Sequence, residues 1–205
     1  MASFGAKRPR FAKIKTEPEN NFPTYEAPVT IGKMIKGDLS INYASGKLFA
    51  DDELAESVDE FSSGSIALET DDITDPIASQ IYGLKVENQE VAYKSGDTPP
   101  PGGLTYFKVL MRRGVKFFKG YYYPRVQAVL GNDTAQTKGD SITFGTSTTN
   151  FTVFQCNTSD WRRTREFTNE ADCIAWCDSK LTGTVFTPQT PPTGDTGDTG
   201  DPDDD

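Results

Sequence analysis

The sequence predicts a mainly β chain of the α+β class. Runs rich in β-branched and aromatic residues recur along it, as in Ser141–Cys156. Leu104–Arg112 and Val115–Tyr123 flank Arg113-Gly114, a pair that suits a tight hairpin turn. Only two segments carry both a helix start and a helix stop signal. These observations favour an antiparallel β body with two helices.

Further strands are expected on either side of the hairpin. Val29–Tyr43 is predicted as a strand because polar and apolar residues alternate over its second half. Arg125–Leu130 follows Pro124, which favours a strand start or an edge strand there. Gly96–Gly103, with the sequence GDTPPPGG, is predicted to be a connector.

The two expected helices are both bounded by glycine. Asp75 is the expected N-cap of the first helix, Pro76 suits its first position, and Gly83 ends it after about two turns. The second helix is expected over about 169–181, with acidic residues in its first turn and Gly183 as its end.

Charge is concentrated at one end of the chain. The 205 residues carry a net charge of −9, and removing the six aspartates of the last eleven residues leaves −3. A mildly acidic body argues against a duplex-DNA-binding protein, which would present a basic face. We expect an acidic, flexible tail over 188–205, which has no aliphatic or aromatic side chain.

The residue types also bear on chemistry. Three cysteines, Cys156, Cys173 and Cys177, do not make a disulfide framework, and buried small apolar residues are favoured over a zinc site. The chain has no histidine, which removes the commonest general base. We therefore predict no enzyme, no catalytic residue, no cofactor and no metal site.

An acidic cluster at Asp71, Asp72 and Asp75 keeps a divalent-metal enzyme open as a remote alternative, although no base or nucleophile accompanies it. No secretion signal and no apolar run of transmembrane length is evident, so we expect synthesis in a cytoplasm and no membrane insertion.

Several blocks of the chain resemble a known family. They are KLFADDELAE at 47–56, IALETDD at 66–72, TKGDSITF at 137–144, and the Ile31-Gly32-Lys33 segment before them. Together they resemble the major tail protein family of long, non-contractile-tailed phages (siphoviruses) of Gram-positive bacteria. The resemblance spans about Phe4 to Phe154, and the chain departs from the family pattern from about Asn157.

The resemblance implies a tail-tube fold: two antiparallel β-sheets packed as a sandwich or half-barrel with a short flanking helix. The domain would span 1–156, followed by a helical extension over 157–187. The implied function is structural, in stacked hexameric rings of a virion tail that conducts DNA into the host without binding it specifically. The implied partners are other copies of the chain, a tape measure protein, a tail terminator and distal tail or baseplate proteins.

In that architecture, 44–60 is expected to be an arm-like loop that docks on the next ring. Acidic residues are expected to face the lumen. The inter-ring contact candidates are Leu48, Phe49, Leu54, Val58 and Phe61, and the lumen candidates are Glu69, Asp71 and Asp72.

Two other classes stay open from the sequence. One is another tube-shaped component, such as a tail terminator or a secretion-tube subunit. The other is a stand-alone β-sandwich binding module that uses aromatic residues such as Tyr121, Tyr122 and Tyr123.

Overall fold

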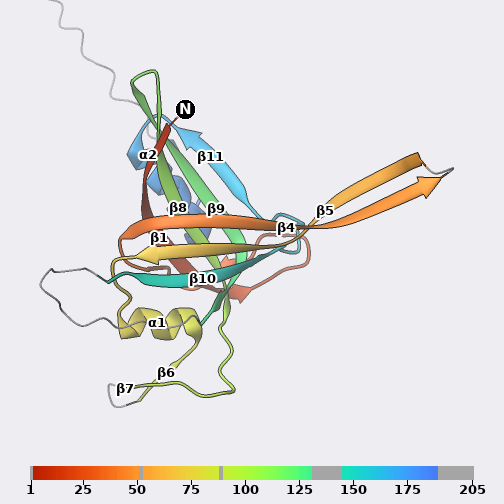
Figure 1. The fold of residues 1–205 in the computed structure, drawn as a ribbon. Helices are drawn as coiled ribbons and strands as arrows, with labels where there is room; N and C mark the ends of the chain where they lie inside the picture. Colours follow the sequence, from red (N-terminus) through yellow and green to blue (C-terminus); the bar gives the residue numbers. More distant parts are fainter. Residues whose placement is uncertain (1, 51–52, 88–89, 131–144, 189–205) are drawn as a thin grey trace, which may run out of the picture.

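The computed structural model describes residues 2–50, 53–87, 90–130 and 145–188. Within these ranges the chain is mainly β, with two helices, which confirms the predicted fold class (Figure 1). The strands are β1 (Ala2–Thr16), β2 (Thr24–Tyr25), β3 (Val29–Thr30), β4 (Met34–Ala50), β5 (Glu53–Thr70), β6 (Lys85–Glu87), β7 (Glu90–Ala92), β8 (Pro101–Arg112), β9 (Val115–Val129), β10 (Ser147–Phe154) and β11 (Arg163–Phe167). The helices are α1 (Asp75–Tyr82) and α2 (Glu170–Thr182).

One large antiparallel sheet organises the body, in the order β2-β1-β8-β9-β10-β5-β4. Strand β9 branches: along one edge, residues 118–122 pair with β11 and residues 125–129 pair with β10. The sheet curls so that β5 and β10 pack over β1 and β8. The two layers of the expected sandwich or half-barrel are therefore halves of one sheet, and β6 and β7 form a separate small one.

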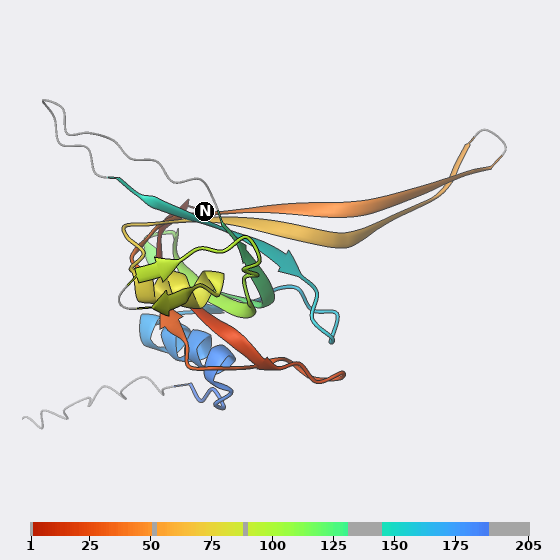
Figure 2. The ribbon, with the colours of Figure 1, turned by 90° about the horizontal axis from the view of Figure 1, so that it is seen from below.

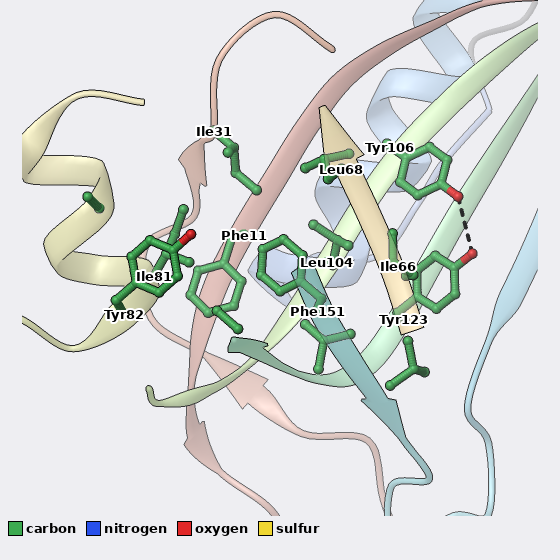
Figure 3. Packing of buried hydrophobic residues seen from close by; sticks show 14 of the residues in the cluster. Phe11, Ile31, Ile66, Leu68, Ile81, Tyr82, Leu104, Tyr106, Tyr123 and Phe151 are labelled. Atoms are coloured by element: carbon green, nitrogen blue, oxygen red, sulfur yellow. Dashed lines mark hydrogen bonds between the residues drawn. The ribbon is translucent and has the colours of Figure 1, made fainter. Parts of the chain in front are cut away.

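The main core fills the space between these layers (Figure 3). The rings of Phe11 from β1 and Phe151 from β10 lie 5.9 Å apart, and both residues are fully buried. The hydroxyls of Tyr106 and Tyr123 are 3.2 Å apart, so each buried phenol has a hydrogen-bonding partner. Helix α1 closes one end of this core with Ile81.

Helix α2 covers the opposite face of β8 and β9 and builds a second core there. A side chain at Gly120 would place its Cβ 2.7 Å from the Trp176 ring, so glycine permits this close packing. The C-terminal helix is confirmed, and it ends at Gly183 as predicted, where the backbone is left-handed. Because β11 also pairs with β9, the extension expected over 157–187 is integral to the folded body.

Three local predictions need correction. Thr74, and not Asp75, is the N-cap of α1, although the helix does end at Gly83. Pro124 lies inside β9, and so does not begin a strand. The connector expected over 96–103 ends early, because β8 starts at Pro101. The predicted hairpin at Arg113-Gly114 is confirmed, with positive φ at both residues.

The cysteines are buried as small apolar residues, in agreement with the prediction. Cys173 and Cys177 are on α2 in the second core, and Cys156 follows β10. Of the residues that the structure describes, none lies in a helix long and apolar enough to cross a membrane.

Candidate assembly surface

A two-stranded ribbon projects from the body (Figures 1 and 2). Strand β10 pairs with β5 only as far as Gly64, but β4 and β5 continue to pair with each other from Tyr43↔Phe61 to Ala50↔Glu53. The segment expected as an arm-like loop over 44–60 is therefore an arm, but its described residues form two paired strands and not a loop. The two strands satisfy each other's backbone hydrogen bonds without a core, so the segment remains extended although it is polar.

The described side chains of the ribbon are open on both faces. Tyr43 is 57% exposed and Val58 is 53% exposed. Across the ribbon, the Ser45 hydroxyl donates a hydrogen bond to Asp59. Three of the inter-ring candidates, Leu48, Phe49 and Leu54, belong to β4 and β5, but their side chains lie outside the described residues. Since a two-stranded hairpin is marginally stable in water, the ribbon depends on its base or on a partner.

The base of the ribbon is fixed to the body by an aromatic stack. The Phe61 ring lies parallel to the Trp161 ring, with 4.4 Å between their centroids. The Arg162 guanidinium covers the indole at 4.6 Å. Phe61, an expected inter-ring contact, is thus half-buried within its own chain. This stack joins residues 100 positions apart, so no local sequence pattern indicates it.

Strand β4 is also an edge of the large sheet. Among the described residues no strand pairs with its outer side, and it runs for 17 residues. A long exposed edge offers backbone donors and acceptors to another strand, which soluble proteins generally avoid. Its charged residues are Lys36, Asp38 and Lys47, of which Lys36 and Asp38 form an ion pair. The edge can accept a strand from another chain.

The outer surface of β4, β5 and β10 is a continuous sheet face, called here the open face. Cross-strand partners fall in rows, such as Ser40, Ser65 and Thr152, which all point away from the core. Every residue of the open face is exposed or half-exposed. The open face consists of Lys36, Asp38, Ser40, Asn42, Ser63, Ser65, Ala67, Glu69, Thr148, Asn150 and Thr152.

Most of the open face is small and uncharged. It carries one cation and two carboxylates, and the ion pair of Lys36 with Asp38 leaves Glu69 as the net negative charge. The hydrogen bond to the Asp38 carboxylate raises the pKa of Lys36 above its ordinary value. The alternation of buried Ile66 and Leu68 with Ser65, Ala67 and Glu69 is the sequence signal that could have revealed this face.

The lumen candidates do not form one patch. Glu69 lies on the open face and accepts a hydrogen bond of 2.6 Å from the Thr146 hydroxyl. Asp71 instead holds a turn: its carboxylate accepts hydrogen bonds from the backbone N–H of Lys33 at 2.7 Å and of Asp72 at 2.9 Å. The Lys33 N–H lowers the pKa of Asp71 below its ordinary value. The Asp72 side chain is exposed beside this turn.

Glycine is required at the same turn. Gly32 has φ of +134°, and a Cβ there would lie 2.5 Å from the Asp72 carbonyl oxygen. Within the described ranges, which include Asp71, Asp72 and Asp75, no group of three or more His, Cys, Asp or Glu side chains is placed to hold a metal ion. Asp71, through its hydrogen bonds, therefore has a structural role at the junction of β3, β4 and β5.

A comparison with known protein families finds no family model that matches this chain, and a comparison with curated proteins finds no match either.

Proposed function

We propose that this chain is a structural subunit of a phage tail tube, which assembles into stacked hexameric rings and forms a conduit for DNA. The observation that carries the proposal is the β4–β5 ribbon, which leaves the body and exposes both faces. A ribbon of this kind is suited to docking on a neighbouring copy, because binding would supply the packing that the free hairpin lacks.

The sheet edge supports side-by-side assembly. In a ring, β4 of one copy would meet a strand of the next copy, so that the sheets join and the exposed edge disappears. Closed rings satisfy the backbone groups of every copy in the same way. The residue resemblance at 47–56 and 66–72 falls on this same pair of strands.

The open face supports a conduit for a polyanion. A wall of hydroxyl and amide side chains with one net negative charge would neither bind phosphates strongly nor repel them far into the channel. We place Glu69 on this wall. Asp71 and Asp72 would lie at its rim, with Asp71 committed to the turn.

In this role the protein needs no catalytic residue or cofactor. Its partners would be other copies of itself, a tape measure protein, a tail terminator and distal tail or baseplate proteins, and its place would be the virion tail.

The test is assembly with and without the ribbon. The purified chain should form tubes of uniform diameter in negative-stain microscopy. In the variant, residues 44–60 are replaced by Asn-Gly, which joins the cross-strand partners Tyr43 and Phe61 by a two-residue turn. This variant should fold, as judged by circular dichroism, and form no tubes.

The control changes another exposed hairpin turn by Arg113→Asn, which gives that turn the same Asn-Gly sequence. This control should still form tubes. Tubes from the ribbonless variant would end the docking role of the ribbon. A wild-type chain that stays monomeric at high concentration would favour a stand-alone binding module.

A further inference from the structure

Cations gather on β11 and α2, on the side of the body opposite the main core. Arg163 lies 4.1 Å from the centroid of the Phe22 ring. Arg165 lies 5.2 Å from Phe167 and 5.0 Å from Phe186, and Lys180 lies 5.5 Å from Trp176. We call Arg163, Arg165 and Lys180, with the rings of Phe22 and Phe186, the cationic surface.

The cationic surface has more positive charge than its neighbours balance. Arg163 forms an ion pair of 2.9 Å with Asp160. Among the described residues, neither Arg165 nor Lys180 has a carboxylate within ion-pair distance. Burial, together with the charges of Arg163 and Arg165, lowers the pKa of Lys180. An anion placed here would relieve this repulsion.

A hollow adjoins these cations. It has a volume of about 410 Å³, and its lining includes Phe22, Lys180, Val185 and Phe186. Aromatic rings and cations around a hollow suit a short acidic peptide, because the rings cover its backbone while the cations pair with its carboxylates.

An acidic segment follows the residues of this site closely in the chain. Phe186 packs against Phe167 with ring centroids 5.6 Å apart, and Pro188 is the last described residue. The next aspartate is Asp195, and 195–205 holds six aspartates and no Lys or Arg. Seven extended residues span up to about 24 Å, so this run can return to the cations beside Phe186.

We propose that the acidic segment 195–205 docks on the cationic surface of its own chain. Arg165 and Lys180 would pair with its aspartates, whose spacing of three residues between Asp195, Asp198 and Asp201 presents carboxylates at regular intervals. The short connection from Pro188 gives the segment a high effective concentration at the site, so weak exposed pairs suffice. This inference does not rest on the proposed function.

The test is zero-length carbodiimide coupling in the full-length chain, which joins a carboxylate to an amine only where the two are in contact. Mass spectrometry should find amide links between Lys180 and aspartates of 195–205. The yield should fall at 1 M salt, where the Debye length is about 3 Å. Lys47 and Lys85, which are exposed elsewhere, are the matched amines and should couple to the segment only at background level.

Two variants and an isotope mixture complete the test. Changing the six aspartates to asparagine should abolish the Lys180 links, and it leaves the described residues untouched. Arg165→Ala should lower their yield by about twofold to fivefold, the range for one exposed charge pair. Equal coupling of the segment to Lys47, Lys85 and Lys180, or an unchanged yield in Arg165→Ala, would overturn the proposal. Links between heavy and light chains in a mixture would also overturn it, by showing docking on a second copy.

Discussion

The two halves of the β4–β5 pair share one antiparallel register but lie in opposite surroundings. In the body half, Ile66 and Leu68 are fully buried, while Ser65 between β4 and β10 is exposed. In the ribbon half, Val58 is 53% exposed, and the described residues on both faces are in solvent. Backbone pairing alone therefore does not create a core. Burial comes from β10 beside the pair and from β1 and β8 beneath it, which only the body half reaches.

The two halves should therefore contribute differently to the free energy of unfolding. Folding stability should reside in the body half, and the ribbon half should contribute little until a partner covers it.

The first prediction compares two β-branched residues of β5. Ile66→Ala removes a fully buried side chain from the main core and should lower the free energy of unfolding by about 2–5 kcal/mol. Val58→Ala trims an exposed side chain of the ribbon and should change it by less than about 0.5 kcal/mol. Urea denaturation of the unassembled subunit measures both values. Similar losses would mean that the ribbon is packed in the free subunit.

The same contrast explains what the sequence could predict. Caps and turns are local, so Gly83, Gly183 and the Arg113-Gly114 turn follow from a few neighbouring residues. The ribbon half could not be predicted as strand because no core selects alternate residues there, and the result was an expected loop over 44–60. Its projection was inferred from the family resemblance alone.

Strand β1 does not follow from the sequence for a different reason. Its two-residue period is broken by bulges, where Gly5 and Arg8 have positive φ and the register to β8 shifts. Its cations also suggest a solvent-exposed segment in the sequence. In the fold, however, Arg8 and Arg10 form ion pairs with Asp178 of α2. Of the candidate site, the acidic residues were visible in the sequence, but their division between the open face and the turn required the fold.

The second prediction concerns the boundary between the two halves. Tyr43 and Phe61 are cross-strand partners, but only Phe61 stacks on Trp161. Phe61→Leu should lower the free energy of unfolding by about 1 kcal/mol through loss of the stack and change tryptophan emission. Tyr43→Leu, at a residue 57% exposed, should have a much smaller effect. Equal effects of the two changes would place the boundary elsewhere.

The third prediction uses the turn that enters the body half. The Lys33 N–H holds the pKa of Asp71 below the ordinary value of 3.8, so the ionised carboxylate favours the folded state. This contribution is present above pH 3.8 and is lost as the pH falls through the lowered pKa. Asp71→Asn should therefore be destabilised at neutral pH, and its difference from wild type should shrink below about pH 3.8.

The comparison variant for that turn is Asp72→Asn. It removes the same charge without touching the hydrogen bond from Lys33, so its loss at neutral pH should be smaller. Thermal unfolding between pH 2 and 7, followed by circular dichroism, distinguishes the two. If both variants lost stability equally, net charge and not the hydrogen bond would be the cause.

The last prediction tests the open face in the assembled tube. The change should have the smallest effect on subunit stability but should slow DNA release. Glu69→Lys removes the acceptor for Thr146 and should alter the free energy of unfolding by only about 0.5 kcal/mol. DNA carries a charge about every 1.7 Å along its axis, so an added ring of lysines on the proposed wall would hold it electrostatically. Particles with this change should assemble and release DNA slowly at low ionic strength. Their rate should recover as salt shortens the Debye length to about 8 Å at 0.15 M.

Glu87→Lys makes the same charge change on β6, away from the open face, and should release DNA at the wild-type rate. Normal release from Glu69→Lys particles at low salt would show that the open face does not line the channel.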